Sequence, residues 1–139
     1  MIENPAPGIQ IERCYQRQMI IFTLTARFTA ATLDTWMAVL SQYVQERQST
    51  SRYIVYDLSQ SPNLMFTSGV SQRLKEIGRL YPDATGRVVA IVPQVGVFQP
   101  IAEFFLQQNN VRAQPNLEIR LFNNRQEGIA WVSEPLTAG

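Results

Sequence analysis

The first third of the chain contains a stripe of apolar residues with the spacing of an α-helix. The stripe follows positions i, i+3, i+4, i+7 and i+11 and consists of Leu33, Trp36, Met37, Leu40 and Val44. Thr32, or Thr29 a turn earlier, is suited to cap this helix, because a threonine hydroxyl accepts a hydrogen bond from a free backbone N–H. The pattern therefore predicts an amphipathic helix with one buried side.

Three later segments also predict helices. The second helix has an apolar side that ends at Tyr81, and Pro82 cannot continue it. Asn124, followed three residues later by Glu127, resembles a capping arrangement at the start of the last helix. The expected helices cover residues 32–44, 68–81, 97–110 and 124–133.

Five segments have the composition of β-strands. Residues 9–15 and 19–26 are separated by a short polar stretch and predict a hairpin at the start of a sheet. Residues 53–56 and 88–92 are almost continuously apolar, so we expect two adjacent, parallel central strands covered on both faces. Residues 116–122 alternate between aliphatic and charged side chains, as a half-buried strand does.

The order ββαβαβαβα predicts a single α/β domain over residues 1–139, with a mostly parallel central sheet, an N-terminal β-hairpin and about four helices. The ordered core is expected at about residues 9–134, between frayed tails. No apolar run approaches the roughly 18 residues of a membrane helix. Residues 1–8 lack the basic start and apolar core of a signal peptide, so we expect a cytoplasmic protein without an integral membrane segment.

The residues required by most familiar active sites are missing. There is no His, which excludes Ser-His-Asp and Cys-His catalysis and His-ligated zinc. Cys14 is the only cysteine and lies in an alternating segment, where we expect it to be a small core residue. None of the eleven carboxylates forms a pair suited to acid/base work, and no phosphate-binding glycine loop is present. We therefore expect neither enzymatic activity nor a metal or other cofactor.

The charge balance also argues against nucleic acid as a partner. The formal net charge is +1, from twelve basic and eleven acidic residues. The basic residues are scattered along the sequence and form no stripe with interleaved aromatics.

The order of several short motifs resembles the STAS family of anti-sigma-factor antagonists, most closely its SpoIIAA-like branch. The motifs are Asp57-Leu-Ser59, Thr67-Ser-Gly69, and the strand Leu117-Glu-Ile-Arg-Leu-Phe122 followed by Glu127-Gly-Ile-Ala-Trp131. The resemblance covers about residues 9–134 and implies a small bacterial α/β domain that binds partners rather than performing chemistry.

In phosphorylatable members of this family, an Asp-Ser-Ser-Gly turn opens the second helix, and a partner kinase that doubles as an anti-sigma factor phosphorylates the second Ser. By position, Ser68 matches the acceptor, Thr67 the preceding Ser and Gly69 the Gly, while Phe66 replaces the Asp. Thr67 is the alternative phosphoacceptor. A phosphate at a helix N-terminus meets free N–H groups and the positive end of the helix dipole. Simple capping explains a Ser at this point equally well, so both readings stay open.

The resemblance implies a partner-binding surface on the segment from Ser59 to Ser71 and on the polar side of the second helix. The expected contact residues there are Asp57, Ser59, Leu64, Met65, Phe66, Thr67 and Gly69. Asp57 is alternatively the residue that ends the strand and bonds the loop backbone. The three apolar residues of the loop alternatively tuck under it as part of the core.

A second reading is a module that binds a lipid or another apolar small molecule, because the SpoIIAA-like branch also resembles the Sec14-like lipid-binding fold. The third expected helix is apolar on more than one side, through residues that include Phe98, Phe104, Phe105 and Leu106. The same width fits a homodimer surface or plain core packing.

Overall fold

The computed structural model describes residues 2–25, 29–60, 68–78, 80–81, 83–92 and 116–137. These residues form one six-stranded sheet with the spatial order β1-β2-β3-β4-β5-β6. The strands are β1 (Ile2–Ala6), β2 (Ile9–Cys14), β3 (Met19–Leu24), β4 (Arg52–Asp57), β5 (Gly86–Ile91) and β6 (Leu117–Phe122). The helices are α1 (Ala30–Glu46), α2 (Ser68–Gly78) and α4 (Arg125–Thr137).

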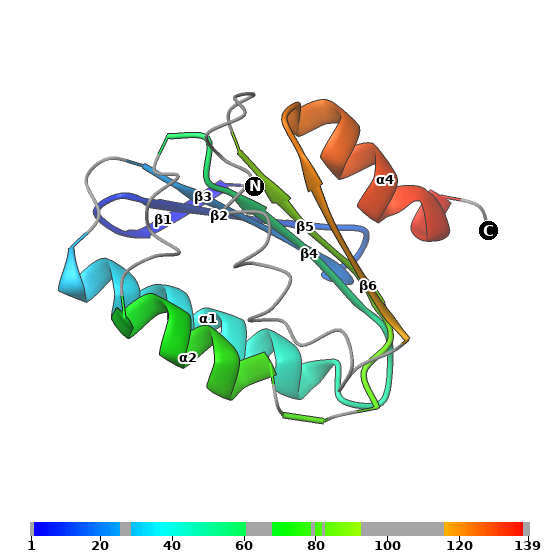
Figure 1. Cartoon of the computed structure of the whole chain (residues 1–139), viewed down its shortest axis with the longest axis horizontal. Helices are drawn as coiled ribbons and strands as arrows, with labels where there is room; N and C mark the ends of the chain where they lie inside the picture. Colours follow the sequence, from blue (N-terminus) through cyan, green and yellow to red (C-terminus); the bar gives the residue numbers. More distant parts are fainter. Residues whose placement is uncertain are drawn as a thin grey trace.

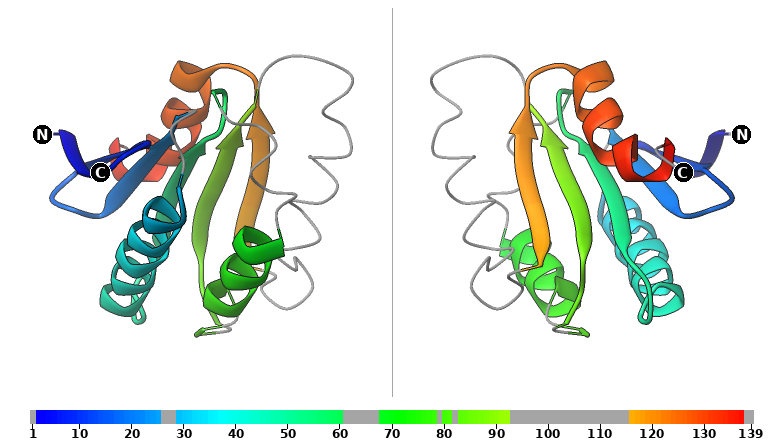
Figure 2. Two further views of the ribbon diagram at one scale, coloured as in Figure 1. Left: turned by 90° about the vertical axis from the view of Figure 1, so that its left-hand side faces the viewer. Right: turned by 90° about the vertical axis from the view of Figure 1, so that its right-hand side faces the viewer.

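The sheet has an antiparallel part followed by a parallel part. The pairs β1–β2 and β2–β3 are antiparallel, whereas β3–β4, β4–β5 and β5–β6 are parallel. The predicted N-terminal hairpin is therefore confirmed as β2–β3, and β4 and β5 are adjacent, parallel strands inside the sheet, as their apolar continuity indicated. Figure 2 shows the arrows of β5 and β6 pointing the same way, with α4 starting at the end of the sheet to which they point.

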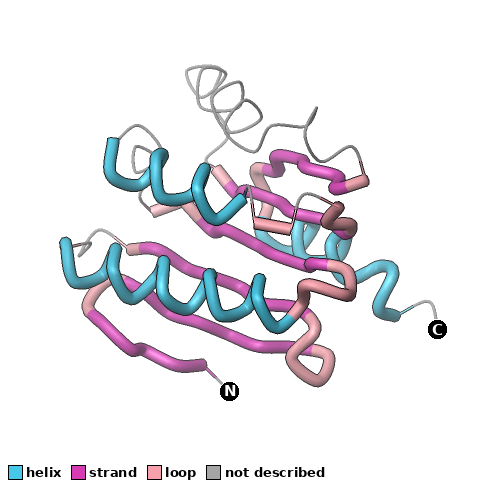
Figure 3. The backbone as a smooth tube through the Cα atoms, turned by 90° about the horizontal axis from the view of Figure 1, so that it is seen from below, coloured by secondary structure: helices cyan, strands magenta, loops and turns pink. Residues whose placement is uncertain are grey.

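Helices cover both faces of the sheet. α1 and α2 lie on one face and α4 on the other (Figure 1), and α1 and α2 run side by side (Figure 3). The face under α1 and α2 holds the larger core, whose biggest fully buried side chains are Trp36 and Phe22. A smaller core, centred on Val55, Val89 and Val132, lies under α4. None of the described helices combines the length and apolar character needed to cross a bilayer.

The first helix matches its prediction closely. The stripe residues Trp36, Met37, Leu40 and Val44 are buried, and Leu33 packs against the same core. Thr29 is the N-cap, and its hydroxyl accepts from the backbone N–H of Thr32 at 3.2 Å. Of the two caps that the sequence left open, the structure therefore uses the earlier one.

Three boundaries differ from the sequence prediction. The tail before residue 9 is not frayed: it forms β1, an edge strand whose Asn4 and Pro5 are poor strand formers and gave no strand signal. α4 continues to Thr137 rather than ending near Ser133. α2 ends at Gly78 rather than near Tyr81, so Leu80 leaves the apolar stripe and is 42% exposed. The expected third helix at residues 97–110 lies outside the described residues.

Candidate functional site

Two buried polar residues of the α4-covered face lie where the parallel strands end. In register across the sheet, Thr23 at the end of β3 lies beside Asp57 at the end of β4, and the next positions on β5 and β6 are the apolar Ile91 and Phe122. Thr23 and Asp57 are only 9% and 5% exposed. The carboxyl ends of parallel strands are where α/β folds place most of their ligand contacts, which makes this edge the natural candidate site.

Arg125, the first residue of α4, closes over this polar edge. Its Nη1 donates to Oδ2 of Asp57 at 2.7 Å and to Oγ1 of Thr23 at 2.9 Å. Its Nη2 lies 3.9 Å from Oε2 of Glu12 on β2. One guanidinium therefore ties the start of α4 to β2, β3 and β4.

The sequence around Arg125 positions α4 for these contacts. Oδ1 of Asn124 accepts from the backbone N–H of Glu127 at 3.0 Å, so the expected cap is confirmed. Gly128 then lets the helix approach the sheet, because a Cβ at this position would lie 2.3 Å from Cδ1 of Ile91 and 3.5 Å from Cβ of Phe122. The first turn of α4 thus lies directly on the ends of β5 and β6.

The second oxygen of Asp57 organises the segment that leaves β4. Oδ1 accepts from the backbone N–H of Ser59 at 3.0 Å and from its hydroxyl at 2.7 Å. The expectation that Asp57 ends the strand and bonds the loop backbone is therefore confirmed. We call Thr23, Asp57, Ser59 and Arg125 the Asp57 cluster. Both carboxylate oxygens are engaged, Oδ2 by Arg125 and Oδ1 by Ser59.

The residues predicted for partner binding fall into three groups. Ser59 is exposed and Asp57 is buried beneath it. Ser68 and Gly69 are the first two residues of α2; nothing is described of the Ser68 side chain. The remaining loop residues Leu64, Met65, Phe66 and Thr67 lie outside the described residues, as do Phe98, Phe104, Phe105 and Leu106.

The outward side of α2 is polar in the part that the structure describes. Gln72 and Glu76 are exposed, and Nη1 of Arg73 lies 2.6 Å from Oδ1 of Asp34 on α1. The opposite side of α2 carries the buried Val70. The predicted division of this helix into an apolar and a polar side is therefore confirmed where its side chains are described.

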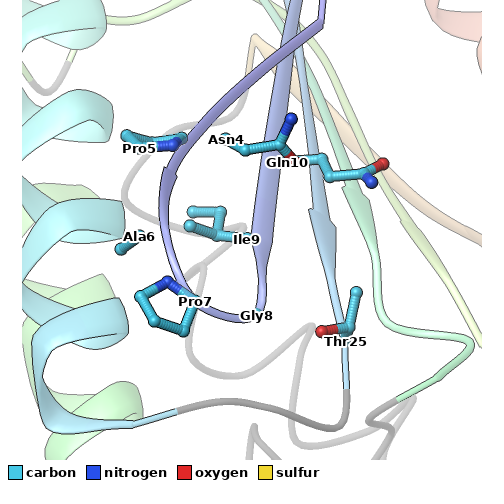
Figure 4. A pocket seen from close by; sticks show the side chains of 8 residues that line it. All are labelled: Asn4, Pro5, Ala6, Pro7, Gly8, Ile9, Gln10 and Thr25. Carbon is cyan, nitrogen blue, oxygen red and sulfur yellow. The ribbon is translucent and has the colours of Figure 1, made fainter.

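A hollow of about 540 Å³ lies at the turn between β1 and β2. Figure 4 shows the residues that line it. Pro5 and Pro7 line it together with the polar groups of Asn4, Gln10 and Thr25. Gln10 is the register partner of Thr23, so the hollow lies one strand away from the Asp57 cluster. Among the described residues that line it there is no charged side chain, and the only nucleophile is the Thr25 hydroxyl.

Sequence reasoning missed Arg125. A basic residue is unfavourable in the first turn of a helix, because it lies at the positive end of the helix dipole. Its presence at this position was the signal that Arg125 pairs with a specific anion. The burial of Cys14 was overestimated: it is half-buried beside the α4-side core, and burial raises the pKa of its thiol. Among the described residues, no three His, Cys, Asp or Glu side chains gather as metal ligands do.

Comparison of the chain with protein-family models, with curated proteins and with solved structures finds no match.

Proposed function

We propose that this chain is a non-enzymatic regulatory module that binds a protein partner, in the manner of anti-sigma-factor antagonists. Its binding surface is the connection from Ser59 to Ser71 together with the exposed side of α2. Phosphorylation of Ser68 by a kinase-type anti-sigma factor switches the surface off. In this proposal the module needs no cofactor and works in the cytoplasm.

The observation that carries the proposal is the position of Ser68 as the first residue of α2. No acidic residue lies in the first turn of this helix, so the positive end of its dipole has no compensating charge there. A phosphate on Ser68 would gain from that dipole and from the free N–H groups of the first turn. The same phosphate would place about two negative charges in the middle of the proposed partner surface.

The Asp57 cluster supports a binding role in preference to a catalytic one. A carboxylate held by Arg125 and by two donors of Ser59 is well suited to fix a strand end. It thereby gives the β4–α2 connection a rigid starting point, as binding loops on α/β scaffolds commonly have.

The test is an affinity capture from the source organism with three immobilised proteins: the wild type, Ser68→Asp and Thr50→Asp. Thr50 is exposed between α1 and β4, so its variant adds the same charge away from α2. We expect the wild type and Thr50→Asp to retain a kinase-type protein and Ser68→Asp to lose it. Equal capture by all three proteins would refute the switch, and no specific capture by the wild type would refute the regulatory proposal itself.

A further inference from the structure

A buried arginine lies at the opposite end of the sheet from the Asp57 cluster. Arg52 is the first residue of β4 and alternates with Tyr53, so its side chain shares the α1 and α2 face with Ile54. Only 3% of Arg52 is exposed. Its Nη2 donates to the backbone carbonyl of Leu80, just beyond the end of α2, at 2.7 Å.

The guanidinium of Arg52 is short of partners. Its Nε is buried and has no hydrogen-bond partner, and none of the ion pairs among the described residues includes Arg52. Burial lowers the pKa of Arg52, and the groups that oppose this shift are the hydroxyls of Tyr56, Tyr43 and Tyr81, not a carboxylate. Buried charges are normally paired, and a missing hydrogen bond in the interior costs free energy. An acceptor that bonds Nε of Arg52 would therefore be stabilising.

The segment that covers Arg52 is also irregular. Leu80 is one of only three large apolar side chains that are exposed in the described part of the chain. Tyr81 has a φ of 56°, a left-handed conformation that is rare for a bulky residue with a side chain. A buried unpaired donor, an exposed leucine and a tyrosine in a left-handed conformation therefore lie close together, just beyond the end of α2.

We propose that Arg52 anchors a binding site for a small organic carboxylate, and that the carbonyl of Leu80 occupies the place of one carboxylate oxygen in the unliganded protein. A carboxylate matches the fork of a guanidinium, and it supplies two acceptors where Leu80 supplies one. The nearby tyrosines favour an acid with an aromatic or short apolar body over a strongly hydrated phosphate. The site is separate from the Ser68 surface, so it goes beyond the proposed regulatory function and is tested independently of it.

The experiment is a titration of the full ¹⁵N-labelled chain with sodium benzoate, followed through the Nε–H signals of the arginine side chains. The Arg52 signal is identified by its absence from the spectrum of Arg52→Met. We expect this signal to shift saturably with benzoate, and the backbone signals of Leu80 and Tyr81 to shift with it. Benzamide has the same shape without the charge, and loss of a charged hydrogen bond weakens binding by about tenfold or more.

The controls decide between the site and a general salt effect. Inorganic phosphate at the same ionic strength should leave the Arg52 signal in place. Arg52→Met should abolish saturable benzoate binding; if this variant does not fold, Arg52→Lys replaces it and should bind at least about tenfold more weakly, because an ammonium lacks the fork. The proposal is overturned if benzoate does not shift the wild-type signal, if benzamide binds as tightly as benzoate, or if the Arg52 variant retains the wild-type affinity.

Discussion

Nη1 of Arg125 lies 2.7 Å from Oδ2 of Asp57, and this contact joins the first residue of α4 to the last residue of β4 across 68 positions of sequence. The side chain of Asp57 is 6% exposed and that of Arg125 is 39% exposed. The carboxylate is thus the buried partner, and the guanidinium is the group that makes its burial tolerable. The stability of the α4 side of the molecule therefore depends on a charge that α4 itself contributes.

Removing the guanidinium of Arg125 should therefore destabilise the folded state. We predict that Arg125→Met lowers the free energy of unfolding by about 1 to 3 kcal/mol, because it leaves Asp57 buried with one oxygen unpaired. Arg73→Met is the matched control, since Arg73 is 38% exposed but its partner Asp34 is 74% exposed. That variant should cost no more than about 0.5 kcal/mol. Urea unfolding of both variants measures the difference, and equal losses would show that the burial of the carboxylate is irrelevant.

Tyr43 should make the protein sensitive to alkaline pH. Its hydroxyl donates to the backbone carbonyl of Gln18 at 2.6 Å and accepts from the backbone N–H of Tyr53 at 2.8 Å. Burial raises the pKa of Tyr43 from 10.0 to about 12. The folded state therefore holds the phenol proton more tightly than the unfolded state does, and the stability from this group is complete below pH 10 and is lost as the pH rises to about 12.

The measurement is the free energy of unfolding between pH 8 and pH 12 for the wild type and Tyr43→Phe. Burial also raises the pKa of Tyr56 and of Cys14, so both proteins should lose stability in this range. The loss should be steeper for the wild type, and Tyr43→Phe should already be less stable by about 1 to 2 kcal/mol at pH 8, where two backbone groups lose their partner. Parallel curves would contradict the pKa shift of Tyr43.

Two glycines should respond differently to the same substitution. A Cβ at Gly86 would lie 1.9 Å from the backbone oxygen of Arg52, and Gly86 has a φ of 124°. Neither backbone can move without breaking the β4–β5 ladder, so Gly86→Ala should destabilise the fold by about 3 kcal/mol or more. At Gly128 the closest atom is the mobile end of Ile91, and alanine gains about 1 kcal/mol of helix propensity.

Gly128→Ala should therefore change stability by less than about 1.5 kcal/mol in either direction. Thermal unfolding of the two variants compares them directly. If Gly86→Ala and Gly128→Ala have the same melting temperature, β4 and β5 do not approach each other as closely as described.

The parts of the fold that were predictable are those in which a repeating pattern decides the structure. The stripe from Leu33 to Val44 and the continuous apolar run of β4 each fix their element through burial alone. β1 was missed because an edge strand is stabilised by pairing with β2 rather than by a pattern of its own. The early end of α2 was missed because Leu80 and Tyr81 continue the apolar spacing beyond Gly78, although glycine is common at helix ends.

In the candidate site, the role of a single residue could be predicted from the sequence, but the contacts between residues of different elements could not. Asp57 was expected to bond the loop backbone because Asp at a strand end commonly does so. Its bond to Arg125, which also donates to Thr23, brings together three separate elements, and no local pattern encodes such a meeting. Arg52 is the extreme case. A basic residue at the start of an apolar strand normally indicates a solvent-exposed strand end, whereas Arg52 is buried and donates to the carbonyl of Leu80, just beyond α2.

Ser68 provides the sharpest test of the regulatory proposal, because its two obvious substitutions separate stability from switching. Ser68 is the first residue of α2. Ser68→Asp would place a negative charge at the positive end of the helix dipole and should add about 0.3 to 1 kcal/mol of stability. Ser68→Ala removes any hydroxyl contact there and should cost no more than about 1 kcal/mol, the usual value of a cap. Urea unfolding measures both effects. The switch requires that Ser68→Asp, the more stable variant, bind the captured partner at least about tenfold more weakly than Ser68→Ala, since a charge rather than a lost contact then controls binding. If the aspartate variant binds as tightly as the alanine variant, Ser68 contributes to the helix start alone.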